Sequence, residues 1–283
     1  MSVLLVECLD RRDLMLAVSR VLFDHGFNVV RSQEFVDRES GRFFMRTEFD
    51  RAVDSACLVE QNKGVLPEGV AVRVASPLPK RIVLLVSREH HCLADLLVRN
   101  QFGTWKARIE AVVGNHLDLG ESVGQFGVPF SSGSATGREP VAHEASLQAC
   151  LEETAPDFIV LANDLRILSP EFVSRDPARI INIHPSFLPT FVGARPSQQA
   201  FQHGVKVTGA TAHFVTDALD EGPILVQQVL PVDPTRSAEA PARSGRDVEQ
   251  FALAQARQLV LKIESFFAEI GRSFLTDHPV ISR

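Results

Sequence analysis

The chain of 283 residues contains no tyrosine, and its four cysteines include no CxxC pair. A mechanism that needs a phenolic acid is therefore excluded, and neither a redox pair nor a cysteine-rich metal knuckle is expected. Without a disulfide framework, the cysteines are expected to be buried, reduced thiols. They are Cys8, Cys57, Cys92 and Cys150.

Long apolar runs and basic runs are also missing. No segment approaches the about 20 apolar residues that a membrane helix needs, and the apolar run at the N-terminus meets acid at Glu7, which is too early for a signal peptide. The formal net charge of −6 argues against a general affinity for nucleic acid or for membrane surfaces. We therefore expect a cytoplasmic protein with no nucleic-acid partner and no membrane partner.

The composition, 45% hydrophobic and 23% charged, is that of a globular protein, and the length allows two domains. Pro77 and Pro79 disfavour helix and stiffen a connection between two patterned regions. We predict one domain at 1–76, a linker at 77–81 and a second domain at 82–283.

The first domain alternates between strand-like and helix-like segments. Strands are expected at 3–9, 27–36, 43–49 and 70–74, and helices at 10–26 and 51–63. The resulting order is βαββαβ, the ferredoxin-like plan.

Asp10-Arg-x-x-Leu14 after the first strand and His25-Gly-Phe-Asn28 after the helix make this domain resemble an ACT domain. The resemblance implies a homo-oligomer that pairs these sheets, and an effector site for a small amino acid at Asp10, Asp13 and Asn28. Asp13 stands where the ACT family usually has glycine. Its carboxylate would repel the carboxylate of an amino acid.

The second domain contains solid apolar runs at 82–86, 109–113, 158–161 and 179–183, typical of parallel strands buried on both faces. Helical segments at 92–100 and 143–153 lie between them, which predicts a doubly wound, Rossmann-like α/β domain. The segment 247–270 is expected to be one amphipathic helix with a shared packing face. Its apolar residues are Val248, Phe251, Leu259, Ile263, Phe266 and Ile270.

Polar side chains end two of these patterns. Asn182 and His184 are two residues apart on a strand and point to the same side, and Asp220 precedes the turn Gly222-Pro223. An amide, an imidazole and a carboxylate together can stabilise an oxyanion and activate water. Taken alone, Asn182 would as readily cap a turn and Asp220 bond its own turn backbone. His213 is interpreted as a packed residue rather than a catalyst.

The stretch 181–227 contains N-I-H-P-S-F-L-P, then H-F-V, then D-E-G-P, and resembles the folate-dependent formyltransferase superfamily. The resemblance implies that Asn182, His184 and Asp220 form the catalytic trio. Asn182 and His184 would hold the oxyanion of the attacked formyl group. Asp220 would pass a proton from water to the departing folate nitrogen and keep His184 protonated.

The same resemblance implies a folate pocket after one strand and beside the Asp220 loop. Its expected residues are Leu165, Arg166, Ile167, Leu168, Val215, Thr216, Asp217 and Leu219. Ser169 and Pro170 form a good N-cap and N1 pair for the helix that follows. No histidine or acid spacing such as HExxH predicts a metal, and the folate would be a substrate rather than a permanently bound cofactor.

The ACT-like first domain, Ser87-x-x-x-His91-Cys92-Leu93 and Gly245-Arg-Asp-Val-Glu249 resemble the formyltetrahydrofolate deformylase family. The resemblance implies hydrolysis of 10-formyltetrahydrofolate to tetrahydrofolate and formate, with water as the second substrate; the formate feeds purine synthesis and the reaction balances one-carbon pools. Pro185 departs from the second histidine usual in that family. Two alternatives therefore stay open: formyl transfer to an unknown amine acceptor, and a weakly active, folate-binding regulatory paralogue.

Overall fold

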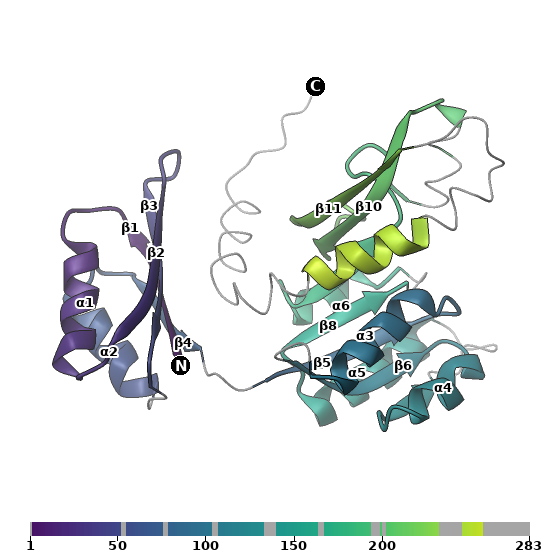
Figure 1. Cartoon of the computed structure of the whole chain (residues 1–283), viewed down its shortest axis with the longest axis horizontal. Coiled ribbons are helices and arrows are strands. Elements are labelled where there is room, and N and C mark those ends of the chain that lie inside the picture. The colour runs from purple at the N-terminus through teal and green to yellow at the C-terminus, as the bar shows by residue number, and fades with distance from the viewer. Residues whose placement is uncertain are drawn as a thin grey trace. The chain divides into compact units, whose positions relative to one another are not determined.

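A computed structural model gives the fold of the chain in two compact units, with the boundary between residues 78 and 79. Each unit is described by itself (Figure 1). The structure describes residues 2–51, 55–75, 79–103, 107–132, 140–163, 167–193, 199, 202–231 and 245–256.

The N-terminal unit is a four-stranded antiparallel sheet with strand order β2-β3-β1-β4. Helices α1 and α2 lie on one face of this sheet (Figure 1). The elements are β1 (Ser2–Leu9), α1 (Leu14–Asp24), β2 (Val29–Asp37), β3 (Arg42–Phe49), α2 (Ser55–Val65) and β4 (Ala71–Ala75). The sequence predicts this same βαββαβ order of elements.

Helix α1 spans Leu14–Asp24 and is therefore shorter than the predicted helix at 10–26. Leu14, Val18, Val21 and Leu22 are buried at helical spacing, and Gly26 follows the helix in the left-handed region with φ 68°. Asp13, at the other end, also has a left-handed φ of 72°. Because glycine reaches this conformation without steric cost, the turn itself favours the glycine that the ACT family usually carries there.

The C-terminal unit is a seven-stranded sheet with order β11-β10-β9-β8-β5-β6-β7. Its elements are β5 (Lys80–Val86), α3 (His91–Gln101), β6 (Ala107–Gly114), a 3-10 turn (Leu117–Leu119), α4 (Gly120–Gly124), β7 (Phe130–Ser132), α5 (Pro140–Thr154), β8 (Phe158–Ala162), α6 (Pro170–Arg175), β9 (Ile180–His184), β10 (Val207–Phe214) and β11 (Ile224–Pro231). A further helix, yellow and unlabelled in Figure 1, includes 245–256.

In sheet order, β7, β6, β5, β8 and β9 pair in parallel. Strand β10 pairs antiparallel with both β9 and β11. The chain fills the sheet outward from β5 through β6 to β7, and then returns to place β8 and β9 on the other side of β5. The switch point of this doubly wound sheet therefore lies between β5 and β8. Ligands of open α/β sheets bind at the carboxyl ends of the strands at such a point.

Both faces of this sheet are covered, as the solid apolar runs predict. Strand β5 sends Ile82 and Leu84 to one core cluster and Val83 and Leu85 to the other. Helix α3 and the helix at 245–256 pack on the first face, and α5 and α6 pack on the second. Ser169 caps α6 as predicted, since its hydroxyl accepts a hydrogen bond from the N–H of Phe172.

The predicted packing face of the C-terminal helix is wrong at Phe251, which is 52% exposed. The buried residues of this helix include Ala252, Leu253 and Ala256 instead. Small side chains let a helix lie close to a sheet, so alanines occupy the packed face that the larger phenylalanine was expected to fill. The rest of the expected helix, 257–270, lies outside the described residues.

Two smaller expectations also need correction. Strand β10 ends at Phe214, before Asp220, so Asp220 belongs to the turn between β10 and β11. Cys57 is exposed and Cys150 is half-buried, so only Cys8 and Cys92 match the prediction of buried thiols. No described helix has the length and apolar character needed to cross a membrane.

Candidate active site

The edge of the sheet at the end of β9 brings the predicted trio together. Asn182 and His184 lie on β9, and antiparallel pairing with β10 sets His213 opposite Asn182. Asp220 reaches the same point from the turn after β10, because its carboxylate lies near both His184 and His213. Four polar side chains therefore converge here, three of them named by the sequence.

His184 is held between two oxygen acceptors. Its Nε2 lies 2.8 Å from the carbonyl oxygen of Phe191, and its Nδ1 lies 3.4 Å from Oδ2 of Asp220. A carbonyl oxygen and a carboxylate only accept hydrogen bonds, so each ring nitrogen of His184 faces an acceptor. The Phe191 bond fixes the ring, so that Nδ1 faces the carboxylate of Asp220.

Asp220 is buried and positioned by its backbone. Its own φ of 56° is left-handed, which asparagine and aspartate tolerate better than most residues. Oδ2 accepts a hydrogen bond from the N–H of Gly193 at 3.0 Å, and Gly193 itself has a φ of 81°. Two unusual backbone conformations, one on each side of the contact, thus hold the carboxylate against His184.

His213 orients the amide of Asn182. Its Nδ1 lies 2.8 Å from the carbonyl oxygen of Phe214, so this nitrogen carries the proton. Nε2 is then an acceptor, and Nδ2 of Asn182 donates to it at 3.3 Å. Burial lowers the pKa of His213, which favours this neutral ring. Asn182 keeps a second amide N–H for another acceptor.

The sequence interpretation of His213 as a packed residue is therefore incomplete. The ring is 2% exposed, as packing requires, but it also contacts Asn182 and lies 3.7 Å from Asp220. The regular pairing of β10 with β9 places this ring directly opposite Asn182. In the sequence, the H-F-V segment of the motif was the one signal that could have identified His213 as part of the site.

Known proteins match both this domain and most of the chain. The formyl transferase family model matches residues 80–256. A Haemophilus influenzae protein named formyltetrahydrofolate deformylase is 46% identical over 260 residues, which are 92% of this chain and 94% of that protein. The chain belongs to the formyltetrahydrofolate deformylase family. The resemblance predicted from the sequence is thus confirmed.

Solved structures separate the deformylase family from its neighbours. The crystal structure of a formyltetrahydrofolate deformylase from Pseudomonas syringae has a TM-score of 0.86 and 36% identity, and covers 92% of this chain and 89% of that one. A phosphoribosylglycinamide formyltransferase from Bacillus halodurans has a TM-score of 0.60 and 27% identity, and covers 64% of this chain and 95% of that one. The deformylase therefore matches a larger part of this chain than the transferase does.

The residues expected to bind folate in a deformylase differ in exposure. Ile167 is 75% exposed and Leu219 is 46% exposed. Leu168 and Val215 pack against the core beside α5 and α6. Leu165 and Arg166 lie outside the described residues.

The loop that follows β10 closes on itself. The hydroxyl of Thr216 donates to the carbonyl oxygen of Ala218, and Oδ1 of Asp217 accepts from the N–H of the same residue. The loop thus holds its own shape and presents Leu219 outward.

The expected effector residues lie in the N-terminal unit, and all are exposed. The backbone N–H of Asp10 donates to Gly41, and that of Asn28 donates to Asp50. Asp13 precedes α1 without a capping bond from its side chain.

Proposed function

We propose that the chain hydrolyses 10-formyltetrahydrofolate to tetrahydrofolate and formate, with water as the second substrate. The observation that carries the proposal is the convergence of Asn182, His184 and Asp220 in a chain that matches named deformylases over about nine-tenths of its length. The solved phosphoribosylglycinamide formyltransferase and glycinamide ribonucleotide transformylase cover 72% and 62% of the chain. Formyl transfer to that acceptor would therefore leave a larger part of the chain unmatched than the deformylase activity does.

Asp220 acts first in the proposed reaction. Its carboxylate takes a proton from the water that attacks the formyl carbon. The backbone N–H of Gly193 holds Oδ2 at 3.0 Å, which leaves Oδ1 to face the water. A positioned acid or base of this kind contributes roughly 10²–10⁴-fold to a rate.

Asn182 and His184 stabilise the charge that develops on the formyl oxygen. The amide N–H of Asn182 that does not bond His213 and the Nδ1–H of His184 donate to this oxyanion. Because His213 fixes the amide and Phe191 fixes the imidazole, the donors are oriented before the substrate arrives. One such donor is worth about 10²–10³-fold in kcat.

Collapse of the tetrahedral intermediate breaks the bond between the formyl carbon and the folate nitrogen. Asp220 returns its proton to that nitrogen, which leaves as the amine of tetrahydrofolate. The formyl carbon leaves as formic acid, which ionises to formate at neutral pH. One water is consumed, and the catalytic residues end in their starting protonation states.

The exposed residues Ile167 and Leu219 are proposed to contact the pterin ring, with the neighbouring expected residues at the edge of the same pocket. Apolar side chains lining a pocket with a few polar groups are typical of small-molecule sites. We expect no resident cofactor, because the three side chains supply all the proton transfers of hydrolysis. A cytoplasmic location stays a prediction.

The N-terminal unit is proposed to be an ACT domain that forms a homo-oligomer. Its element order and sheet order support this, as does the edge strand β2, where Val30 is 51% and Phe35 is 53% exposed. An edge strand with exposed apolar side chains is a template for pairing with another chain. An effector site at Asp10, Asp13 and Asn28 stays a prediction.

The test of the activity is formate release from 10-formyltetrahydrofolate by the purified chain without any amine acceptor. We expect steady release that falls at least about 10²-fold in Asp220→Asn, while binding of the folate measured by fluorescence is retained. Glu221→Gln is the matched control, since this neighbouring carboxylate is exposed. Folate binding without release, or full turnover by Asp220→Asn, would contradict the proposal.

A further inference from the structure

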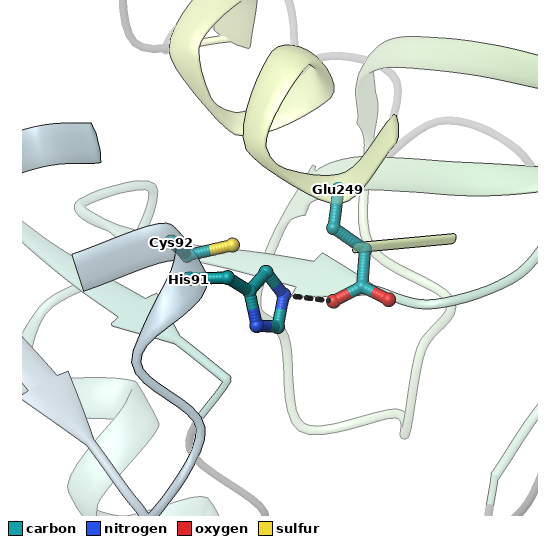
Figure 2. Close-up of side chains that lie close together, drawn as sticks. All are labelled: His91, Cys92 and Glu249. Carbon is teal, nitrogen blue, oxygen red and sulfur yellow. Dashed lines mark hydrogen bonds and ion pairs between the residues drawn. The ribbon is translucent and has the colours of Figure 1, made fainter. Parts of the chain in front are cut away.

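Two segments that the proposed hydrolysis does not use meet in the C-terminal unit. His91 and Cys92 belong to the segment Ser87–Leu93 and begin α3. Glu249 belongs to the segment Gly245–Glu249 and lies on the helix at 245–256. Figure 2 shows the three side chains pointing toward one another from these two helices, although His91 and Glu249 are 158 positions apart in the chain.

The spacing of these side chains is close to that of a metal centre. One ligand atom from each residue lies within 4.8 Å of the others. Nε2 of His91 and Oε2 of Glu249 are 2.8 Å apart. Tetrahedral zinc with bonds of about 2.0–2.3 Å separates its ligand atoms by roughly 3.3–3.8 Å. Shifts of about 1 Å would therefore admit a cation between the three.

Burial and charge favour a cation at this point. His91 is 7%, Cys92 1% and Glu249 8% exposed. In the part of the chain that the structure describes, Glu249 accepts hydrogen bonds from His91 and Asn163, whereas Arg246 pairs with Glu89. A buried carboxylate is costly unless its charge is compensated. A divalent cation with one carboxylate, one thiolate and one neutral imidazole makes a site of zero net charge.

Two buried polar atoms beside the cluster have no hydrogen-bond partner among the residues that the structure describes. They are Nδ1 of His91 and Oδ1 of Asn163. When Nε2 of a histidine binds a metal, Nδ1 carries the proton and usually faces an oxygen acceptor. Oε2 of Glu89 lies 3.7 Å from Nδ1, close enough to take that role after a small rotation. Oδ1 of Asn163 would accept a hydrogen bond from a water in the fourth position on the cation.

We propose that His91, Cys92 and Glu249 bind a divalent cation of the zinc class. A thiolate together with an imidazole selects zinc, cobalt or ferrous iron over magnesium and calcium. Binding releases the thiol proton to solvent and replaces the hydrogen bond between His91 and Glu249 with a bond from each residue to the cation. The site is separate from the trio proposed for hydrolysis and does not depend on that function.

The cation would pin the C-terminal helix at the switch point of the sheet. Asn163, the second hydrogen-bond partner of Glu249, directly follows β8. Strand β8 pairs with β9 so that Leu161 lies opposite Asn182. Two residues further along both strands, Asn163 comes level with His184. The metal site would thus lie one strand away from the candidate active site. It would hold the helix at 245–256 against this edge of the sheet.

The test is a titration of the full-length, chelator-treated protein with Co²⁺, followed by displacement with Zn²⁺. We expect one equivalent of cobalt to give a thiolate-to-cobalt charge-transfer band and visible bands of low coordination number. Cys92→Ser and Glu249→Gln should lose the charge-transfer band or weaken binding by more than about 100-fold, and Asn163→Ala by roughly 10–100-fold. Cys8→Ser, which removes the other buried thiol, should bind as the parent does.

Two results would overturn the proposal. The first is a parent protein that gives no charge-transfer band at stoichiometric or excess cobalt, in which case His91 and Glu249 form a plain hydrogen bond. The second is a band that survives in Cys92→Ser, which would place the cation elsewhere. Because the titration of the parent protein decides by itself, a variant that fails to fold leaves the test intact.

Discussion

Gly222 makes the position of Asp220 sensitive to a single methyl group. The turn that carries Asp220 passes directly against β10, where the N–H of Phe214 donates to the carbonyl oxygen of Pro223 at 2.9 Å. A Cβ at position 222 would lie 1.8 Å from the carbonyl oxygen of Phe214 and 2.8 Å from its carbonyl carbon. Both atoms are backbone, so neither can rotate away as a flexible side chain would.

Gly222→Ala should therefore displace the turn rather than a neighbouring side chain. The Cβ and the Phe214 oxygen must separate by at least about 1.2 Å to reach 3.0 Å, below which Cβ contacts are essentially never seen. Overpacking of this kind costs about 1–3 kcal/mol of stability. A misplacement of about 1 Å at a catalytic group costs on the order of 10²-fold in rate. Asp220 is two residues away in the same turn, so most of this displacement of the backbone should reach it.

The assay compares formate release and urea unfolding for Gly222→Ala and for Gly124→Ala. Gly124 lies in α4, where a Cβ meets nothing within 4 Å, so the control should keep its turnover and gain slightly in stability. We expect the Gly222 variant to remain folded at low urea and to lose about 10²-fold in kcat. Turnover within twofold of the parent would show that the turn has room and that our account of Asp220 is wrong.

Variants at three further positions give testable outcomes. Burial lowers the pKa of His213 below its ordinary 6.5, so the unfolded state takes up a proton that the folded state resists. The free energy of unfolding should therefore fall as pH drops through about 6.5, and this fall should be smaller in His213→Asn. The same variant should lower kcat by about tenfold or more through Asn182, with a flatter acid limb in the rate profile. Ile167→Asp should raise the KM for the folate with little change in kcat, whereas Leu117→Asp, equally exposed but away from the β8 edge, should change neither. Phe35→Lys should lower the molar mass measured by light scattering, and an unchanged mass would contradict an oligomer formed through β2.

The fold of the C-terminal unit could be predicted because its signals are strong and local. Solid apolar runs mark strands buried on both faces, and β5 does send alternate residues to two cores. The C-terminal helix misled the sequence interpretation because a helical pattern of large residues was taken as its packed face. Phe251 is exposed, and the alanines at 252 and 256 are buried, since the distance between a helix and a sheet is a tertiary property that hydrophobicity does not encode.

The site could be predicted only as far as its motif reached. Asn182, His184 and Asp220 were named from the sequence, and the structure brings them together. The cluster of His91, Cys92 and Glu249 could not be foreseen as one place, because its members are separated by more than half the chain and show no metal-ligand spacing. When two helices that are distant in the sequence meet at one edge of a sheet, the site between them leaves no local sequence motif.

His213 was set aside for a different reason. A histidine on a strand alternates its direction with its neighbours, and from the sequence its side is unknown. The pairing of β10 with β9 decides the matter, because its regular register sets His213 opposite Asn182. The turn that follows β10 brings the carboxylate of Asp220 to 3.7 Å from the same ring. The regular ladder between β9 and β10 thus aims the imidazole that orients the amide of Asn182, and the turn after β10 adds the carboxylate of Asp220.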